Sequence, residues 1–262
     1  MDILVCIKQV PGTTTVEVDE ETGVLKRDGI DTKMNPYDLY AVETALKIKE
    51  EVGGTITVMT MGPPQAKEVI SEAFMMGVDD GVLLSDRKFA GADVLATSYT
   101  LAQGVKKVGK FDLIICGKQT TDGDTAQVGP EMAECLEVPH IANVKKIIDI
   151  KEGAMVVDMD MPTTVDTVEI QLPCLLTVDK GIFQPRLPSF RKKLATKDKP
   201  IKIWGLKDFD NQDEKRYGLD GSPTQVEKIF PPDSDTDQEI WKGTSETLAL
   251  QIFDKLKELK FI

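Results

Sequence analysis

The first half of the chain alternates short apolar runs with segments in which apolar residues recur every three to four positions. The runs at residues 3–7, 55–61 and 111–117 are typical of central parallel strands, because such strands are buried on both faces. We therefore predict an α/β fold with a doubly wound, mostly parallel, Rossmann-like sheet, followed by a C-terminal extended arm and helix. Helices are expected from Pro36 (with Asn35 as N-cap) to Gly53, over 65–76, over 92–108, and from near Thr125 to Leu136.

The pattern changes after Pro139, where short apolar stretches are separated by turn residues. This spacing indicates a β-meander that completes the edge of the same domain, and the domain would span residues 1–185. Alternating apolar and charged residues at 16–27 predict a small exposed hairpin. The strands expected at the edge are residues 144–150, 155–159, 165–172 and 175–178.

The regular alternation ends at Lys180, and residues 186–262 are expected to form a separate C-terminal region. Residues 208–234 are polar and contain several Gly and Pro, which indicates an extended arm rather than a core segment. Residues 244–260 have the pattern of an amphipathic helix. This helix could wrap a partner subunit or pack on its own domain, and the pattern leaves both open. Its apolar face would consist of Leu248, Ile252, Leu256 and Leu259.

The formal net charge of −12 argues against nucleic-acid binding by the chain as a whole. No apolar run approaches the roughly 18–20 residues of a membrane span. The start at Met1 lacks the features of a secretory signal, so we expect a cytoplasmic protein without membrane insertion. His140 is the only histidine, which excludes a histidine-dependent triad or a multi-histidine metal site within the chain. We expect neither a catalytic side chain nor a metal ligand.

A polar, glycine-containing loop at residues 122–131 follows the third apolar run. Open α/β sheets usually bind nucleotides at loops between a buried strand and a helix. Asp124 is expected to cap a helix that starts near Thr125, with Gln127 in capping-box spacing, and the helix N-terminus would offer free N–H groups to an anion. Asp122 and Asp124 would repel a phosphate unless they cap the helix or bind ribose hydroxyls. The loop therefore predicts a nucleotide site without assigning which part of the nucleotide is held.

Three further loops are expected at the same end of the sheet, because the carboxyl ends of parallel strands converge on one crevice. Each loop alone is compatible with ordinary turn chemistry, and their convergence is what favours a nucleotide site. The glycine pattern G-x-G-x-x-G does not follow the first strand, so the standard dinucleotide fingerprint is absent. The three loops are residues 8–12, 34–38 and 61–64.

Taken in order along the chain, these motifs resemble the beta subunit of electron transfer flavoprotein, and the resemblance covers nearly the whole chain. It is carried by residues 3–11, 34–38, 61–63, 116–119 and 122–129. It implies a heterodimer with an alpha subunit, around which the C-terminal arm and helix would wrap. It also implies a nucleotide held by Cys6, Asn35, Pro36, Tyr37, Asp38, Met61, Asp122, Gly123, Asp124, Thr125, Ala126, Gln127, Val128 and Gly129.

Within that family, residues 122–131 are similar to the NADH-dependent, electron-bifurcating branch, whereas the other branch usually departs from this sequence at and after Val128. The resemblance implies FAD as the nucleotide and NADH as the electron donor. Electrons would pass to an acyl-CoA or related dehydrogenase and to ferredoxin or flavodoxin, with the cofactors supplying the chemistry. Two alternatives stay open: a non-bifurcating carrier with structural AMP in the same site, and an ATP-binding α/β domain outside the family.

Residues 186–202 carry seven basic residues and one acid. A run of like charges is usually a solvated face. Phe190 lies in the middle of this run, however, and an exposed aromatic flanked by cations would anchor an acidic protein partner. In the family, a leucine followed by lysines in this region grips acyl-CoA dehydrogenases. Phe190 falls at the position of that leucine, so the resemblance implies that Phe190 anchors a partner, an acyl-CoA or related dehydrogenase. The departure from leucine, and the different residues 191–194 that follow, change which dehydrogenase is expected.

Overall fold

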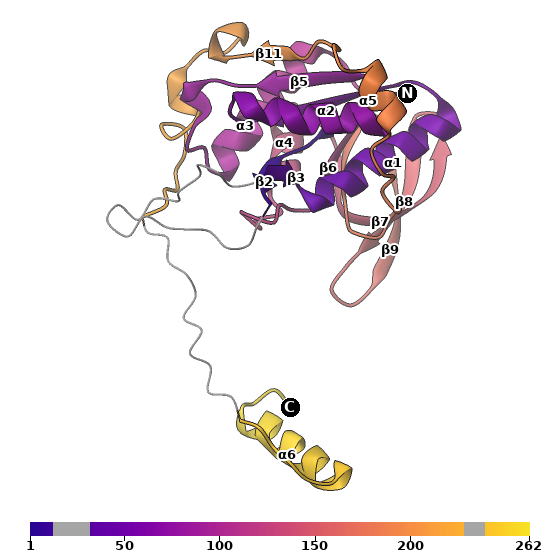
Figure 1. Ribbon diagram of the computed structural model, residues 1–262, viewed down its shortest axis with the longest axis vertical. Helices are drawn as coiled ribbons and strands as arrows, with labels where there is room; N and C mark the ends of the chain where they lie inside the picture. Colours follow the sequence, from indigo (N-terminus) through magenta and orange to yellow (C-terminus); the bar gives the residue numbers. More distant parts are fainter. Residues whose placement is uncertain (13–31, 228–238) are drawn as a thin grey trace.

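The computed structural model describes residues 1–12, 32–227 and 239–262. A nine-stranded sheet with the order β11-β5-β4-β1-β6-β10-β7-β8-β9 forms its centre (Figure 1). A separate antiparallel pair consists of β2 (Gln9–Pro11) and β3 (Thr32–Met34). The strands of the large sheet are β1 (Asp2–Cys6), β4 (Thr55–Met61), β5 (Asp80–Leu84), β6 (Leu113–Gly117), β7 (His140–Lys151), β8 (Ala154–Asp160), β9 (Val165–Gln171), β10 (Cys174–Val178) and β11 (Lys202–Trp204).

Strand β1 lies in the middle of the sheet and pairs in parallel with both β4 and β6. The chain first extends the sheet from β1 through β4 to β5, and then returns to the other side of β1 with β6 and β10. This confirms the predicted α/β fold with a doubly wound, mostly parallel sheet. The direction of winding reverses between β1 and β6, which is where sheets of this kind bind their ligands.

Helices cover both faces of the parallel part of the sheet (Figure 1). Ile3 and Val5 belong to the core beneath α1 and α2, whereas Leu4 and Cys6 belong to the core beneath α3 and α4. Both faces of β1 are therefore covered by apolar side chains, which explains its uninterrupted apolar run. The helices are α1 (Pro36–Val52), α2 (Lys67–Met76), α3 (Val94–Val108), α4 (Val128–Leu136), α5 (Phe190–Ala195) and α6 (Ser245–Glu258).

The predicted meander is confirmed, since β7, β8 and β9 pair antiparallel in that order. Strand β10 does not lie at the edge, however. It lies between β6 and β7, parallel to both, and all five of its residues are buried. The expectation of an edge position is therefore wrong, and the continuous apolar run of β10 fits a central strand. The hairpin predicted at residues 16–27 lies outside the described residues.

After residue 185 the chain returns to the sheet, where β11 pairs with β5. Phe209 and Tyr217 are buried, and their rings lie 6.0 Å apart beside Phe89. The prediction of an extended arm is therefore wrong for the start of the 208–234 segment. Two buried aromatic side chains are enough to pack this polar stretch against the core. In the described part of the chain, the C-terminal region from residue 186 is thus partly integrated into the α/β domain.

Helix α6 is amphipathic as predicted, but none of its residues is buried. Figure 1 shows the helix lying away from the sheet and its covering helices. The structure therefore does not show the helix packed on its own domain, and the apolar side chains of Ile252, Phe253 and Leu256 are exposed. Of the helices within residues 32–227 and 239–262, none is both long and apolar enough to cross a membrane.

Candidate functional site

The loops of the predicted crevice meet at the carboxyl ends of β1 and β6, and we call the place where they meet the crevice. Lys8 lies two residues after the end of β1. Its carbonyl oxygen accepts a hydrogen bond from the backbone N–H of Asn35 at 2.8 Å. This contact brings the beginning of α1 beside the end of β1. The loop that follows β6, residues 118–127, lies against both, so three of the predicted loops meet as expected.

Asn35 joins two of these loops through its side chain. It is fully buried, its Nδ2 donates to the carbonyl oxygen of Gln119 at 2.9 Å, and its Oδ1 accepts from the N–H of Thr121 at 3.2 Å. Helix α1 begins at Pro36, as predicted, but the Asn35 side chain does not cap it. Asn35 instead holds the loop after β6, a role that the local sequence pattern could not reveal.

Asp38 is another buried polar residue of this crevice. Its carboxylate accepts the N–H of Lys8 at 2.7 Å, and it lies against Gly117 at the end of β6. Burial raises the pKa of Asp38 from 3.8 to about 7, although hydrogen bonds from Asn35 and Lys8 oppose the rise. Asp38 therefore organises the crevice from within, and only 4% of its surface is exposed for contact with a ligand.

The raised pKa of Asp38 predicts a pH-dependent contribution to stability. Between pH 4 and 7 the Asp38 carboxyl ionises in the unfolded chain but keeps its proton in the folded chain. The contribution of Asp38 to the free energy of unfolding therefore falls as the pH rises through this range, and it stays constant above pH 7. Asp38→Asn should therefore gain stability relative to the parent chain across this range, by on the order of a few kcal/mol. Urea unfolding at pH 4.5, 6 and 7.5 measures the difference.

A suitable control for this prediction is Asp86, whose pKa is lowered overall. Burial alone would raise the pKa of Asp86, but hydrogen bonds from the backbone N–H groups of Lys88 and Leu206 outweigh this effect. Ionised Asp86 stabilises the parent chain above about pH 4, and this stabilisation is lost at lower pH. As the pH rises through about 4, the free energy of unfolding of Asp86→Asn should therefore fall below that of the parent chain. Identical pH profiles for Asp38→Asn and the parent chain would contradict the assignment.

The loop at residues 118–127 differs from the expected helix start. Helix α4 begins at Val128 with Gln127 as N-cap, and Gln127 makes no side-chain capping bond. Asp124 and Ala126 have φ values of 52° and 57°, which are left-handed and interrupt a helix at these positions. The predicted capping by Asp124 is therefore wrong, and its carboxylate instead accepts from the side-chain amide of Gln119.

The two aspartates of the loop thus have partners within the described residues. Asp122 forms an ion pair with Lys8 at 2.7 Å, and both side chains are partly exposed. Burial opposes ionisation of Asp122, but Lys8 lowers its pKa overall. The charge that would repel a phosphate is therefore compensated across the crevice. Lys8 was missing from the predicted site residues, although an excess of carboxylates in the loop is the signal that a cation must lie nearby.

The other predicted residues fall into three groups. Cys6 is buried with its Sγ 4.0 Å from the Sδ of Met132, so it faces the core under α4. Pro36, Tyr37 and Met61 are half-buried at the ends of α1 and β4 that border the crevice. Residues 121–127 are exposed, and this stretch includes Gly123, Thr125 and Ala126.

The N-terminus of α4 completes the crevice. Gly129 in its first turn is buried, and a Cβ there would meet the Thr177 side chain, so glycine allows α4 to approach β10 closely. The exposed hydroxyl of Thr125 and the amide of Gln127 precede this helix. Hydroxyl, amide and backbone N–H groups at a helix N-terminus are donors suited to phosphate and ribose oxygens. The chemistry of these residues is compatible with the phosphate and ribose of a nucleotide.

Comparison with known proteins supports this description. The family described as "Electron transfer flavoprotein domain" matches residues 22–208. The chain is 45% identical to the caffeyl-CoA reductase-Etf complex subunit CarD of Acetobacterium woodii, over 100% of both chains. It is 42% identical to the electron transfer flavoprotein subunit beta of Clostridium acetobutylicum, also over 100% of both, and 38% identical to protein FixA of Azorhizobium caulinodans, over 99% of this chain and 96% of that one.

Proposed function

The chain belongs to the electron transfer flavoprotein family as a beta subunit, and we propose that it works with an alpha subunit as a cytoplasmic, NADH-oxidising, electron-bifurcating flavoprotein. Membership of the family excludes the alternative of an ATP-binding domain outside it. The similarity to CarD supports the bifurcating branch, because that relative is a subunit of a caffeyl-CoA reductase-Etf complex.

The observation that carries the proposal is the polar crevice between β1 and β6 with the N-terminus of α4 at its edge. We propose FAD as its occupant. When bound, FAD would accept electrons from NADH and deliver them separately, toward a dehydrogenase and toward ferredoxin or flavodoxin. Thr125, Gln127 and the first N–H groups of α4 would bind phosphate and ribose oxygens. Asn35 and Asp38 would fix the loops that carry these donors.

Nucleotide analysis of the purified heterodimer tests this proposal. Acid extraction followed by chromatography should release two FAD per heterodimer, one from each subunit. One FAD and one AMP would contradict bifurcation and leave a carrier with a structural nucleotide. The control is Thr125→Ala combined with Gln127→Ala, which should lower the amount of nucleotide bound by the beta chain without changing that of the alpha chain.

We also propose that α6 covers the alpha subunit, so that residues after the α/β domain form an arm between the two chains. The support is the exposed apolar face of α6, since an amphipathic helix of this kind gains stability only when that face is covered. Ile252→Asp combined with Leu256→Asp should abolish co-elution of the two subunits in gel filtration, whereas Gln251→Ala on the same helix should not.

The proposed dehydrogenase site is the segment around Phe190. Phe190 is 73% exposed at the start of α5, as an anchoring residue must be. The basic side chains beside it suit an acidic partner, and we propose an acyl-CoA or related dehydrogenase.

A further inference from the structure

The segment from residue 186 to 195 exposes more apolar surface than Phe190 alone. Leu187 is 87% exposed and Leu194 is 64% exposed. Phe190 and Leu194 are four residues apart and therefore share one face of α5. We call Leu187, Phe190 and Leu194 the apolar ridge. Exposed apolar side chains gathered in this way mark a protein-binding surface.

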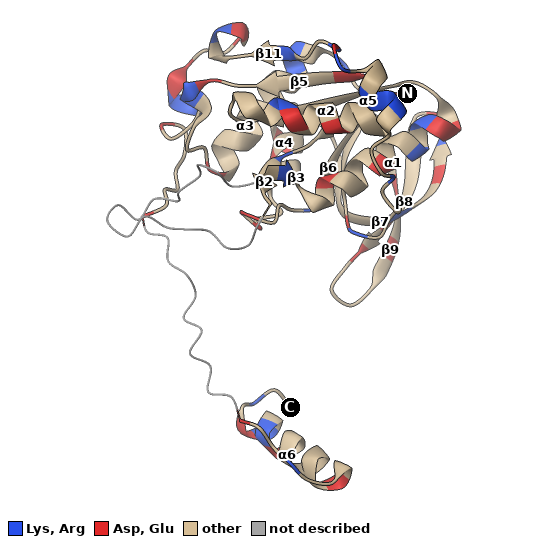
Figure 2. Ribbon diagram, viewed as in Figure 1, with Lys and Arg blue, Asp and Glu red and all other residues tan. Residues whose placement is uncertain are grey.

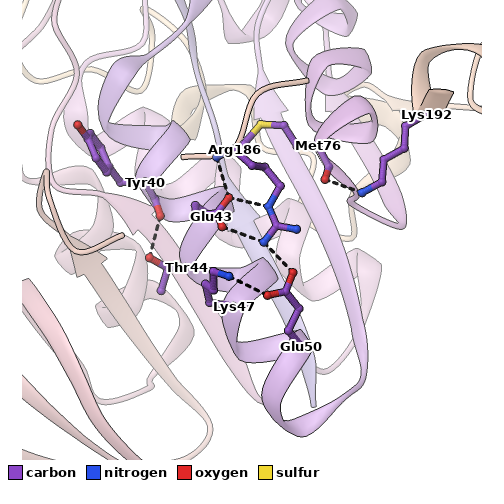
Figure 3. Close-up of polar contacts among 8 residues, drawn as sticks. All are labelled: Tyr40, Glu43, Thr44, Lys47, Glu50, Met76, Arg186 and Lys192. Carbon is purple, nitrogen blue, oxygen red and sulfur yellow. Dashed lines mark hydrogen bonds and ion pairs between the residues drawn. The ribbon is translucent and has the colours of Figure 1, made fainter. Parts of the chain in front are cut away.

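Arg186 fastens the start of this segment to α1 (Figure 3). Its Nε and Nη2 donate to the two carboxylate oxygens of Glu43, each at 2.8 Å, and its backbone N–H donates to Glu43 at 3.0 Å. The Glu43 side chain is only 2% exposed. Arg186 Nη2 also pairs with Glu50 at 2.8 Å. A two-pronged contact with a buried carboxylate fixes both the position and the orientation of the guanidinium group.

The end of α2 provides a second attachment. The backbone N–H of Ser189 donates to the carbonyl oxygen of Met75 at 3.0 Å. Lys192 Nζ donates to the carbonyl oxygen of Met76 at 2.7 Å, as Figure 3 shows. Cations are favoured at the carboxyl end of a helix, where free carbonyl groups are concentrated. Arg186, the Ser189 N–H and Lys192 therefore attach the segment to the domain, while the apolar ridge is left exposed.

Charge indicates the chemistry of the partner. Residues 186–202 carry seven basic residues against one acid in a chain whose net charge is −12. Figure 2 shows Lys and Arg on α5, beside α2. A local basic patch on an acidic molecule directs an acidic partner to this patch, because the rest of the surface repels it.

We propose that Arg186 is a positioning residue for docking: it holds the apolar ridge in its binding conformation before the partner arrives, and the partner is a dehydrogenase with an apolar groove rimmed by carboxylates. The inference rests on the proposed electron-transfer function. Holding the segment in advance removes part of the ordering cost of association, so the affinity depends on a residue that itself lies behind the ridge.

The test uses the complete heterodimer, with NADH as donor and purified butyryl-CoA dehydrogenase as the probe. Ferredoxin is present to take the second electron of each pair, and crotonyl-CoA is present to reoxidise the dehydrogenase. Arg186→Met should raise the apparent KM for the dehydrogenase at least tenfold and change kcat by less than twofold. Arg186→Lys, which keeps the charge but not the two-pronged contact, should fall between Arg186→Met and the parent chain. The matched control is Lys193→Met, which removes the same charge from the exposed side of the segment and should raise KM by less than threefold.

Hydrogen exchange of the backbone amides of residues 189–196 in the same heterodimers supplies the second measurement. Exchange should be faster in Arg186→Met than in Lys193→Met. An unchanged KM in Arg186→Met overturns the inference. A raised KM with unchanged hydrogen exchange also overturns it, because Arg186 would then act by direct contact with the dehydrogenase. If Arg186→Met does not assemble, Glu50→Gln, which removes one exposed partner of Arg186, must show the same two effects in weaker form. A parent heterodimer that does not reduce the dehydrogenase saturably contradicts the proposed function instead, while the exchange comparison still reports on the attachment.

Discussion

Gly117→Ala is expected to unfold at a distinctly lower urea concentration than the parent chain and to lose the nucleotide of the crevice. A Cβ at this position would lie 2.8 Å from the carbonyl carbon of Tyr37 and 2.9 Å from its Cβ, and closer still to Oδ1 of Asp38. None of these atoms can move freely, because Tyr37 and Asp38 are in the first turn of α1 and Asp38 is buried. Overpacking of this kind costs about 1–3 kcal/mol, and we expect the upper part of this range.

Gly123→Ala is the matched control for this substitution, since it lies in the loop of the same crevice. A Cβ at Gly123 would meet only Thr120 Oγ1, at the ordinary contact distance of 3.4 Å. Its unfolding midpoint should therefore stay close to that of the parent chain. Equal losses of stability in the two variants would show that steric overlap with Tyr37 and Asp38 is not the reason why position 117 requires glycine.

Asn35→Ala is expected to have the largest effect on nucleotide binding of any single side-chain removal in the crevice. The substitution leaves the carbonyl oxygen of Gln119 and the N–H of Thr121 without their present partner. Both hydrogen bonds are only partly buried, so losing them costs at most about 1–3 kcal/mol, and the freed loop should move to bind water instead. Because about 1.4 kcal/mol corresponds to a factor of ten, the affinity for the nucleotide should fall at least tenfold.

Equilibrium dialysis of the nucleotide-depleted heterodimer against AMP and FAD measures this affinity. The control is Asn211→Ala, because the Asn211 side chain accepts one hydrogen bond from Asp213 within its own loop and has no contact with the crevice. Unchanged affinity in Asn35→Ala would mean that the Lys8–Asp122 ion pair alone suffices to hold the loop.

The sequence predicted the parallel sheet well because its central strands are covered on both faces and therefore consist mainly of apolar residues. It also placed the three loops of the crevice correctly, since their position follows from the direction of parallel strands. The contacts within the crevice were not predictable in the same way. Asn35 reaches Gln119 across 84 positions of sequence, and nothing in the neighbourhood of Asn35 distinguishes such a contact from a helix cap.

Two other features were hidden for different reasons. Asp124 and Ala126 adopt left-handed backbone angles, which L-residues rarely do, so a spacing typical of a capping box gave the wrong helix start. The segment around Phe209 and Tyr217 is polar overall, and its attachment depends on two rings rather than on a periodic pattern. Composition averages over such a segment and therefore predicts an arm where the structure has a packed turn.

The central position of β10 has a consequence for the order in which the sheet can assemble. During synthesis the chain makes β7, β8 and β9 before β10, although β10 lies between β6 and β7. Until residue 178 has been made, the nascent sheet consists of two pieces, with unpaired edges at β6 and at β7. Unpaired edges can bind strands of other chains. The two pieces can join into one sheet only after β10 has been synthesised, because β10 pairs with both β6 and β7. Until then the newly made protein is prone to aggregation.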